Sequence, residues 1–470
     1  MIFHSIDFII FFIVVISLYW QLPRREQTLF LLLSSYFFYG YVHPWFLLLI
    51  LTSTVVDYVC GRSIAAGVGH RKAWLVLSLA TNLGLLGVFK YFNFFVENIS
   101  LLLTGLGFSG LETTLQVVLP VGISFYTFQT ISYTVDVYRG KLQACKNPMD
   151  FAVYVSFFPQ LVAGPIERAT HLLPQIQKPR RIDRTDIYEG LLLILWGFFK
   201  KLVIADNVAE VANQVFYLKE PSFFILWAGV FAFAVQILAD FSAYTDIARG
   251  VARLLGITLC QNFNHPYFAV SPADFWRRWH MSLSYWIRDY LYIPLGGSHG
   301  AWFMAARNLL ITFVLCGLWH GASWNFILWG AYHGLLILTF RGLTNLAYPH
   351  WVHAGWFRPV RVLFMFVLTC IGWLIFRETN LELLVRDLLL SPWHSSSADL
   401  LLAMFLFSKA LLFGLPLWLH GFYDQWQLGA WLKQRPARFI LGSQLFAISA
   451  FVLILVARSK VPADFIYFQF

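Results

Sequence analysis

The stretch RNLLITFVLCGLWHG, Arg307 to Gly321, runs from a charged residue through a largely apolar segment to a histidine. An α-helix rises ~1.5 Å per residue, so the thirteen steps from Arg307 to His320 place the imidazole ~20 Å beyond the arginine. That distance is past the midpoint of a ~30 Å hydrocarbon core. Ionisable groups at such depth are costly and usually functional. The stretch therefore predicts a membrane helix that carries His320 as the leading candidate for a functional residue.

The composition of the whole chain also indicates a membrane setting. Of its 470 residues, 59% are hydrophobic and only 12% are charged, and the mean hydropathy is +0.65. A soluble protein is about one quarter charged. Apolar runs lie near residues 5–20, 28–40, 45–58, 73–92, 98–121, 150–163, 188–204, 222–245, 307–320, 324–345, 361–376, 399–418 and 437–457. We expect an all-α integral membrane protein with about ten or more membrane helices, the shorter runs forming re-entrant segments.

Basic residues in the early loops indicate the orientation of the chain. Arg24 and Arg25 follow the first apolar run, and Arg62 and Arg71 follow the third, so both loops should be cytoplasmic. The first run lacks the basic start and cleavage site of a signal peptide, and we interpret it as a retained span. We found no repeat or long linker and expect one polytopic domain over residues 1–470. Within it we distinguish peripheral helices over about 1–120, a motif-rich core over about 121–345 and carboxy-terminal helices over about 346–470.

The formal charge of +10 is ordinary for a membrane protein with basic cytoplasmic loops and does not by itself indicate nucleic acid. Basic residues are densest between 168 and 201, including Arg180 and Arg181. Anionic lipid and topology explain such a cluster, but it is also a candidate contact for a phosphate-rich donor. The five cysteines are scattered and give neither a disulfide framework nor the spacing of a zinc site, so no metal is expected.

Two of the apolar segments carry polar residues at helical spacing. Over 121–139, Gln129 and Tyr133 fall on one face of a predicted helix, where they line a wet pocket or bond to a neighbouring helix. Over 236–249, Asp240 requires a partner because carboxylates are costly in a membrane. It either supports a site or pairs within the bundle.

Two further stretches contain the histidines. DFWRRWHMSLSYWIRDYLYIPLGG, 274–297, mixes arginine and aromatic residues in the pattern of a membrane interface, and its His280 follows Arg277 and Arg278 closely. Taken alone, His280 is read as interfacial or structural. The other stretch continues past His320, where Gly317 and Gly321 allow close helix packing. His333 should not share the face of His320 unless the helix breaks near Gly321 or Gly330.

Together these stretches resemble the membrane-bound O-acyltransferase family, in particular its bacterial branch of alginate, peptidoglycan and cellulose O-acetylating proteins. The resemblance spans most of the chain, and the order of its motifs is highly specific. They are VGISFYTFQTISYTVDVYRG (121–140), FFPQLVAGPIER (157–168), FFKKLVIAD (198–206), DFSAYTDIARG (240–250), NFNHPY (262–267), FWRRWHMSLSYWIRDYLYIPLGG (275–297), GLWHGASWNFILWGAYHG (317–334) and DFIYFQF (464–470).

The resemblance implies many membrane helices around a central funnel, with His320 as the buried catalytic histidine. His280 then matches the second histidine of the branch, which shapes the cytoplasmic mouth or aligns substrate. A neutral imidazole suits the activation of a hydroxyl near neutral pH, because its ordinary pKa is ~6.5 and burial disfavours its charge. Substrate-binding roles, including oxyanion donors near His320, are assigned to Asp240, Gln129, Tyr133, Trp319, Trp324, Asn325, Arg277 and Arg278.

The resemblance also implies the substrates, partners and location. The donor would be acetyl-CoA, with no bound cofactor, and the protein would be a multi-pass protein of the bacterial inner membrane, in contact with its lipids. A separate periplasmic acetyltransferase or assembly subunit would receive the acetyl group, and the acceptor would be alginate, peptidoglycan or another polysaccharide. Two other classes stay open: a protein or peptide O-acyltransferase of the same fold, and a transporter or flippase without acyl transfer.

Overall fold

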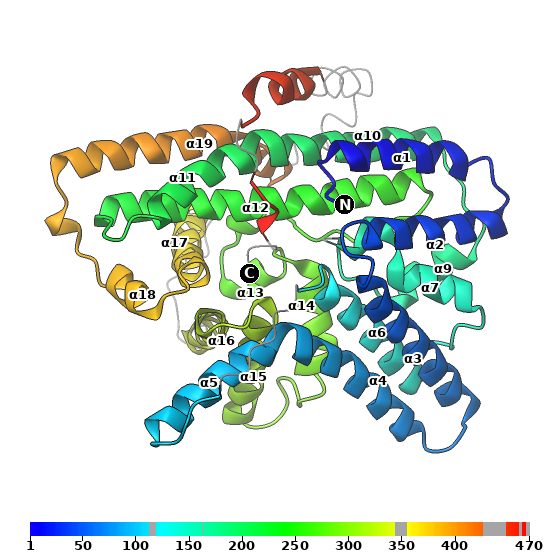
Figure 1. Cartoon of the computed structure of the whole chain (residues 1–470). Coiled ribbons are helices and arrows are strands. Elements are labelled where there is room, and N and C mark those ends of the chain that lie inside the picture. Colours follow the sequence, from blue (N-terminus) through cyan, green and yellow to red (C-terminus); the bar gives the residue numbers. More distant parts are fainter. Residues whose placement is uncertain (112–118, 163, 344–354, 426–447, 460–462, 467–470) are drawn as a thin grey trace. The chain divides into compact units, whose positions relative to one another are not determined.

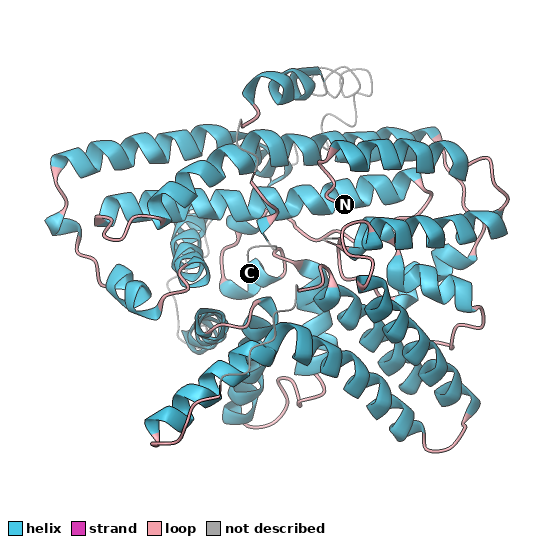
Figure 2. Ribbon diagram, viewed as in Figure 1, coloured by secondary structure: helices cyan, strands magenta, loops and turns pink. Residues whose placement is uncertain are grey.

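Helices make up the regular structure throughout the described part of the chain (Figures 1 and 2). The computed structural model describes residues 1–111, 119–162, 164–343, 355–425, 448–459 and 463–466. Parts of the apolar runs predicted at 98–121, 150–163, 324–345 and 437–457 and the last four residues of DFIYFQF lie outside these ranges. The contacts divide the chain into two compact units, residues 1–191 with 248–260 and residues 192–247 with 261–470. The prediction of one domain with three sections stays a prediction.

The first unit contains the amino-terminal helices. They are α1 (Ile6–Tyr19), α2 (Arg24–Gly40), α3 (Phe46–Ala66), α4 (Arg71–Leu86), η1 (Gly87–Tyr91), α5 (Phe92–Gly105), α6 (Ile123–Tyr138), α7 (Pro148–Ser156), α8 (Phe158–Leu161), α9 (Ala169–Gln177) and the start of α10 (Arg184–Phe199). The end of α12 (Phe223–Leu254) and the extended segment after it complete this unit.

A buried carboxylate joins three helices of the first unit. Asp57 on α3 is fully buried and accepts hydrogen bonds from Ser78 and Asn82 on α4 and from Thr134 on α6. An unsatisfied carboxylate would be costly there, so these donors fix the relative positions of the three helices. This polar centre accounts for part of the polarity of the 121–139 stretch without a ligand.

The second unit contains the histidine motifs. Its elements after α10 are η2 (Lys200–Ala205), α11 (Asp206–Phe216), most of α12, η3 (Pro266–Phe268), α13 (Pro272–Trp276), α14 (Met281–Ile287), η4 (Arg288–Tyr292), α15 (Trp302–His320), α16 (Trp324–Leu343), η6 (Gly355–Phe357), α17 (Arg358–Arg377), α18 (Leu381–Leu388), η7 (Pro392–His394) and α19 (Ser397–Gln425).

Helices α15 and α16 form a tightly packed hairpin. The helix is interrupted between His320 and Trp324, near Gly321, where the sequence indicated a possible break. A Cβ on Gly317 would collide with the carbonyl oxygen of Phe326, and one on Gly330 would collide with that of Phe313. Gly317 and Gly330 therefore let the two backbones touch, which confirms the packing role predicted for Gly317.

Seven helical segments in the described ranges are long and apolar enough to cross a membrane. They are Phe46–Ala66, Arg71–Gly105, Phe223–Leu254, Trp302–His320, Trp324–Leu343, Gly355–Arg377 and Ser397–Asp424. Ile6–Tyr19 and Ile448–Ala457 are shorter apolar helices. The predicted all-α integral membrane class is confirmed, while the central funnel stays a prediction.

Candidate functional site

His320 is the last residue of α15 and lies in an aromatic enclosure within the second unit. Its side chain is almost fully buried. Its ring centre is 4.9 Å from those of Trp319 and Trp329 and 5.4 Å from that of Phe376, all in edge-on arrangements. The burial expected from the sequence is therefore present, because α16 and α17 both contribute rings around the end of α15. Its depth in the bilayer stays a prediction.

His280 lies between α13 and α14 in a left-handed backbone conformation, with φ of 41°. Non-glycine residues seldom adopt this conformation, and it persists only where the surroundings enforce it. The side chain of Asn262 contacts this segment, and its Oδ1 lies 3.1 Å from Nδ1 of His280. The same oxygen accepts from both the backbone nitrogen and the hydroxyl of Ser282.

This contact determines which nitrogen of His280 carries the proton. The backbone nitrogen of Ser282 can only donate, so the Asn262 atom that it contacts must be the oxygen. Nδ1 of His280 therefore donates to that oxygen, and Nε2 carries the lone pair in the neutral ring. Burial lowers the pKa of His280 to about 3, which keeps the ring neutral at neutral pH.

Trp319 connects the two predicted histidines. Its ring centre lies 4.9 Å from that of His320 and 6.0 Å from that of His280. The sequence places the histidines forty residues apart, and the fold brings both to one indole. The fold thus places two buried imidazoles against one indole, and imidazole is the side chain that most often serves as a general base toward a hydroxyl.

His333 joins this cluster, although the sequence analysis treated it as secondary. Trp329 lies 4.9 Å from His320 and 4.8 Å from His333 between ring centres. The ring of His333 also stacks on Phe275 of α13. In one continuous helix His320 and His333 would point to different faces. The helix breaks after His320, as the sequence analysis required for the two residues to lie on the same side.

The other predicted residues near His320 differ in their surroundings. Trp319 is buried, whereas the side chain of Trp324 is 48% exposed. Asn325 is fully buried, and its amide nitrogen donates to the carbonyl oxygens of Ile375 and Phe376 at 3.3 and 2.9 Å. Asn325 thus holds the end of α17 beside His320. Among these three residues, Trp319 is the one whose ring packs against both histidines.

Arg277 and Arg278 share one carboxylate at the start of the His280 segment. The Arg278 side chain lies 3.0 Å from Asp274 and is 20% exposed, while Arg277 lies 3.8 Å from it and is 66% exposed. Arg278 is therefore mainly a structural partner of α13. Arg277 offers its guanidinium to solvent and to anions.

Asp240 on α12 belongs to a buried charge cluster. Nζ of Lys201 lies 3.0 Å from Asp240 and 2.9 Å from Asp206. The second oxygen of Asp240 accepts from the backbone nitrogen of Ile466 at 2.6 Å, and Lys201 donates to the carbonyl oxygen of Ala463 at 2.7 Å. The cluster therefore binds the segment 463–466 beside α12 (red in Figure 1).

Segment 463–466 packs near His280 through the rings of Phe465 and Phe241. The ring of Phe465 lies 6.1 Å from that of Phe241, and Phe241 lies 4.8 Å edge-on from His280. Asp240 thus supports the packing around His280 through the chain end that it holds. This arrangement combines the two alternatives left open for Asp240, since it pairs within the bundle and lies next to the histidine cluster.

Gln129 and Tyr133 lie in the first unit and are both buried. The Gln129 amide donates to the carbonyl oxygen of Tyr154 on α7, and the Tyr154 hydroxyl donates back to the Gln129 carbonyl. The Tyr133 hydroxyl accepts from the backbone nitrogen of Cys145 at 3.0 Å. These contacts tie α6 to α7 and the chain before it, and a substrate role for either residue stays a prediction.

Comparison with known proteins matches this pattern of motifs and helices. A model of the MBOAT, membrane-bound O-acyltransferase family, matches residues 144–385, a range that contains both histidines of the cluster. The chain is 42% identical over 391 residues to a protein of Azotobacter vinelandii named "Probable alginate O-acetylase AlgI", covering 82% of this chain and 77% of that protein.

Two further relatives have different acceptors or acyl groups in their names. The peptidoglycan O-acetyltransferase of Helicobacter pylori is 36% identical over 386 residues, covering 75% of this chain and 71% of that protein. The teichoic acid D-alanyltransferase of Bacillus subtilis is 28% identical over 274 residues, covering 54% of this chain and 68% of that protein.

The apolar helices and the match to the family define a multi-pass membrane protein. The chain belongs to the membrane-bound O-acyltransferase family.

Proposed function

We propose that this protein is a membrane O-acetyltransferase of the bacterial inner membrane. It would move an acetyl group from a cytoplasmic thioester, acetyl-CoA, toward a hydroxyl of a cell-envelope or exported polysaccharide. The relatives with the higher identities support acetyl as the acyl group, because their names specify O-acetylation of alginate and of peptidoglycan. A periplasmic partner would receive the acetyl group and complete its delivery.

The observation that carries the proposal is the meeting of His280 and His320 at Trp319 within the family's matched range. We assign the general-base role to His320. Its imidazole takes the proton of the acceptor hydroxyl as the oxygen attacks the thioester carbonyl, which is worth roughly 10²–10⁴ in rate. The thiolate of CoA leaves when the tetrahedral intermediate collapses, and a proton returns to it.

The negative charge of that intermediate requires a donor close to the base. We propose that the indole N–H of Trp319 supplies it, since this ring contacts both histidines whereas the Asn325 amide nitrogen is engaged by α17. His280 would align the substrate, as the resemblance to the family implies, with its ring oriented by the contact of Nδ1 with Asn262.

The test is acetyl transfer from radiolabelled acetyl-CoA in membrane vesicles that contain the wild-type protein or His320→Ala. We expect at least a hundredfold loss of labelled product in the variant, from the general-base contribution. His299→Ala is the matched control, because His299 is an exposed histidine in the loop before α15. Equal loss in the control, or full activity of His320→Ala, would remove His320 from the mechanism; transport without acetyl turnover would favour a flippase.

A further inference from the structure

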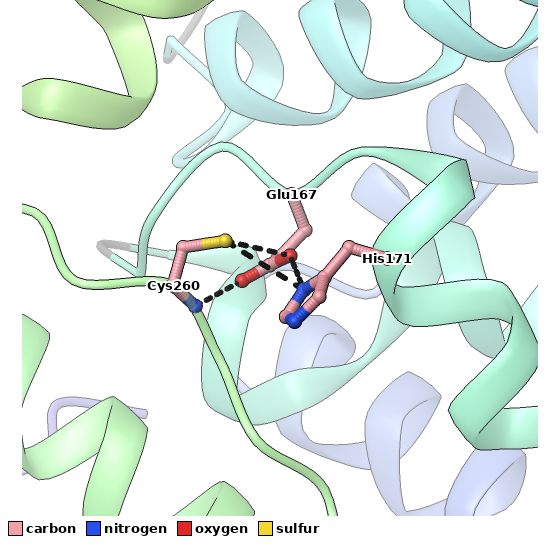
Figure 3. A group of neighbouring side chains, drawn as sticks. All are labelled: Glu167, His171 and Cys260. Atoms are coloured by element: carbon pink, nitrogen blue, oxygen red, sulfur yellow. Dashed lines mark hydrogen bonds and ion pairs between the residues drawn. The ribbon is translucent and has the colours of Figure 1, made fainter.

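A cluster of three metal-ligand side chains lies in the first unit, in a different unit from the histidine cluster. Glu167 precedes α9, His171 is the third residue of α9, and Cys260 lies in the extended segment after α12 (Figure 3). We propose that Glu167, His171 and Cys260 bind a divalent zinc ion, with water as the fourth ligand. The site is independent of the proposed acyl transfer.

The spacing of the three ligand atoms resembles one face of a zinc tetrahedron. The Cys260 sulfur lies 3.6 Å from Nδ1 of His171 and 3.5 Å from Oε2 of Glu167. Usual zinc bond lengths at tetrahedral angles separate a sulfur from a nitrogen or oxygen ligand by ~3.6 Å. The two distances that involve sulfur therefore already fit a zinc ion.

The third distance is shorter, and its chemistry explains the difference. Nδ1 of His171 lies 2.7 Å from Oε2 of Glu167, which is a hydrogen bond, whereas two zinc ligands of this type would be ~3.4 Å apart. Zinc binding would exchange this hydrogen bond for two coordinate bonds from the same atoms. The proton of that hydrogen bond would leave Nδ1, so that the neutral His171 ring keeps its N–H at Nε2. Cys260 would release its thiol proton to solvent and bind as thiolate, so binding would strengthen as the pH rises.

Surrounding contacts already hold two of the ligands in place. Glu167 is fully buried, and its Oε1 accepts from the backbone nitrogen of Cys260, which leaves Oε2 facing the other two ligands. Gln175 on α9 exchanges two hydrogen bonds with the backbone of Thr258, at 2.9 and 3.0 Å. These contacts fasten the extended segment to α9, and the carboxylate is presented by a rigid frame.

Access and ligand type both favour zinc. The His171 side chain is 42% exposed, so an ion can enter from solvent although the carboxylate is buried. Thiolate, imidazole and carboxylate together suit zinc, whereas magnesium and calcium prefer oxygen ligands alone. The positive ion would also neutralise the buried carboxylate.

A nucleophilic triad is the competing interpretation of the same residues. In such a triad one ring nitrogen of histidine contacts the nucleophile and the other contacts the carboxylate. Here Nδ1 of His171 is the atom that contacts both Cys260 and Glu167. The His171 ring therefore cannot relay a proton from Cys260 to Glu167 through its two nitrogens. Three ligand atoms that point to one place are instead the arrangement that binds a metal ion.

The first measurement is metal content and X-ray absorption of the full-length protein, purified in detergent with a tag free of histidine and incubated with zinc before desalting. We expect about one zinc per chain, with one sulfur ligand at ~2.3 Å and nitrogen or oxygen ligands at ~2.0–2.1 Å. A metal-free protein, or zinc bound without sulfur, would overturn the proposal. The latter result would fit the cluster His265, His420 and Asp424 in the second unit.

Substitutions then identify the ligands. Cys260→Ser and His171→Gln should each lower retained zinc at least tenfold, and in cobalt-loaded protein Cys260→Ser should abolish the sulfur-to-cobalt charge-transfer band. Cys145→Ser is the control, because Cys145 is a free cysteine of the same unit outside the cluster. Unchanged zinc in the Cys260 variant would refute the assignment. The wild-type absorption spectrum decides the matter even if a variant fails to fold.

Discussion

At the scale of single residues, His280 has a left-handed backbone conformation, a proton on Nδ1 and a neutral ring. The left-handed conformation and the Asn262 contact orient the imidazole, and burial lowers its pKa to about 3. In the unfolded chain the pKa returns to ~6.5, so between about pH 3 and 6.5 the unfolded state binds more protons than the native state. The contribution of His280 to stability is complete above about pH 6.5 and is lost as the pH falls toward 3.

This linkage predicts the behaviour of His280→Asn, whose amide can replace the Nδ1 donor and whose backbone tolerates a left-handed conformation. Between pH 7 and 5 the wild type should lose about 2 kcal/mol more unfolding free energy than the variant, from ~1.4 kcal/mol per pH unit below 6.5. Denaturant unfolding in detergent at the two pH values measures the difference. Identical losses would show that His280 is already protonated or exposed in the native state.

The residue scale also shows what sequence could and could not predict. The motifs predicted His320 and its burial. Residue 320 also lies within the range that the family model matches. Nothing in the spacing predicted the zinc site, because Glu167 and Cys260 are 93 positions apart and meet only when α9 packs on the segment after α12. The role of Asp240 depends in the same way on residues 463–466, which are more than 220 positions further along the chain.

At the scale of elements, the α15–α16 hairpin sets the position of His320. Its backbones approach so closely at Gly317 that an added methyl group meets the Phe326 carbonyl, which belongs to a rigid helix and cannot move aside. The sequence predicted Gly317 and Gly321 as packing residues, and it named Gly330 only as a possible break in the helix. It did not predict that the break after His320 would turn His333 toward the same tryptophan.

Gly317→Ala should therefore destabilise the protein by about 1–3 kcal/mol through overpacking and should also lower acetyl transfer, because the end of α15 shifts with His320. The matched control is Gly84→Ala on α4, where nothing lies within 4 Å of an added Cβ and alanine should stabilise the helix by up to ~1 kcal/mol. Thermal unfolding and activity of both variants provide the measurement. Equal stability of the two variants would contradict the close-contact argument.

At the scale of the whole molecule, the positive charges divide into two kinds. Lys200, Lys201 and Arg180 are buried, and Arg180 donates to the Thr28 hydroxyl at 2.8 Å. The sequence grouped Arg180 with Arg181 as a contact for the donor, but its burial makes Arg180 a structural residue. Lys178, Arg181 and Arg184 are exposed and can meet phosphate groups.

If acetyl-CoA binds at this region, Lys178→Ala combined with Arg181→Ala should raise the Michaelis constant for acetyl-CoA several-fold at low salt with little change in kcat, because each exposed charge adds modest attraction. Kinetics at two ionic strengths measure the effect, which should shrink at high salt. Lys72→Ala, which removes an exposed basic residue at the start of α4, is the control. An unchanged constant would leave membrane topology as the role of these charges.

The docking of residues 463–466 on Asp240 also has a consequence for biosynthesis. Ile466 is made 226 residues after Asp240, and a ribosome adds about 5–20 residues per second, so ~10–45 s separate the two. During that interval Lys201 and the two carboxylates have only one another as partners within this cluster. The surroundings of His280 are therefore completed only after residues 463–466 have been made.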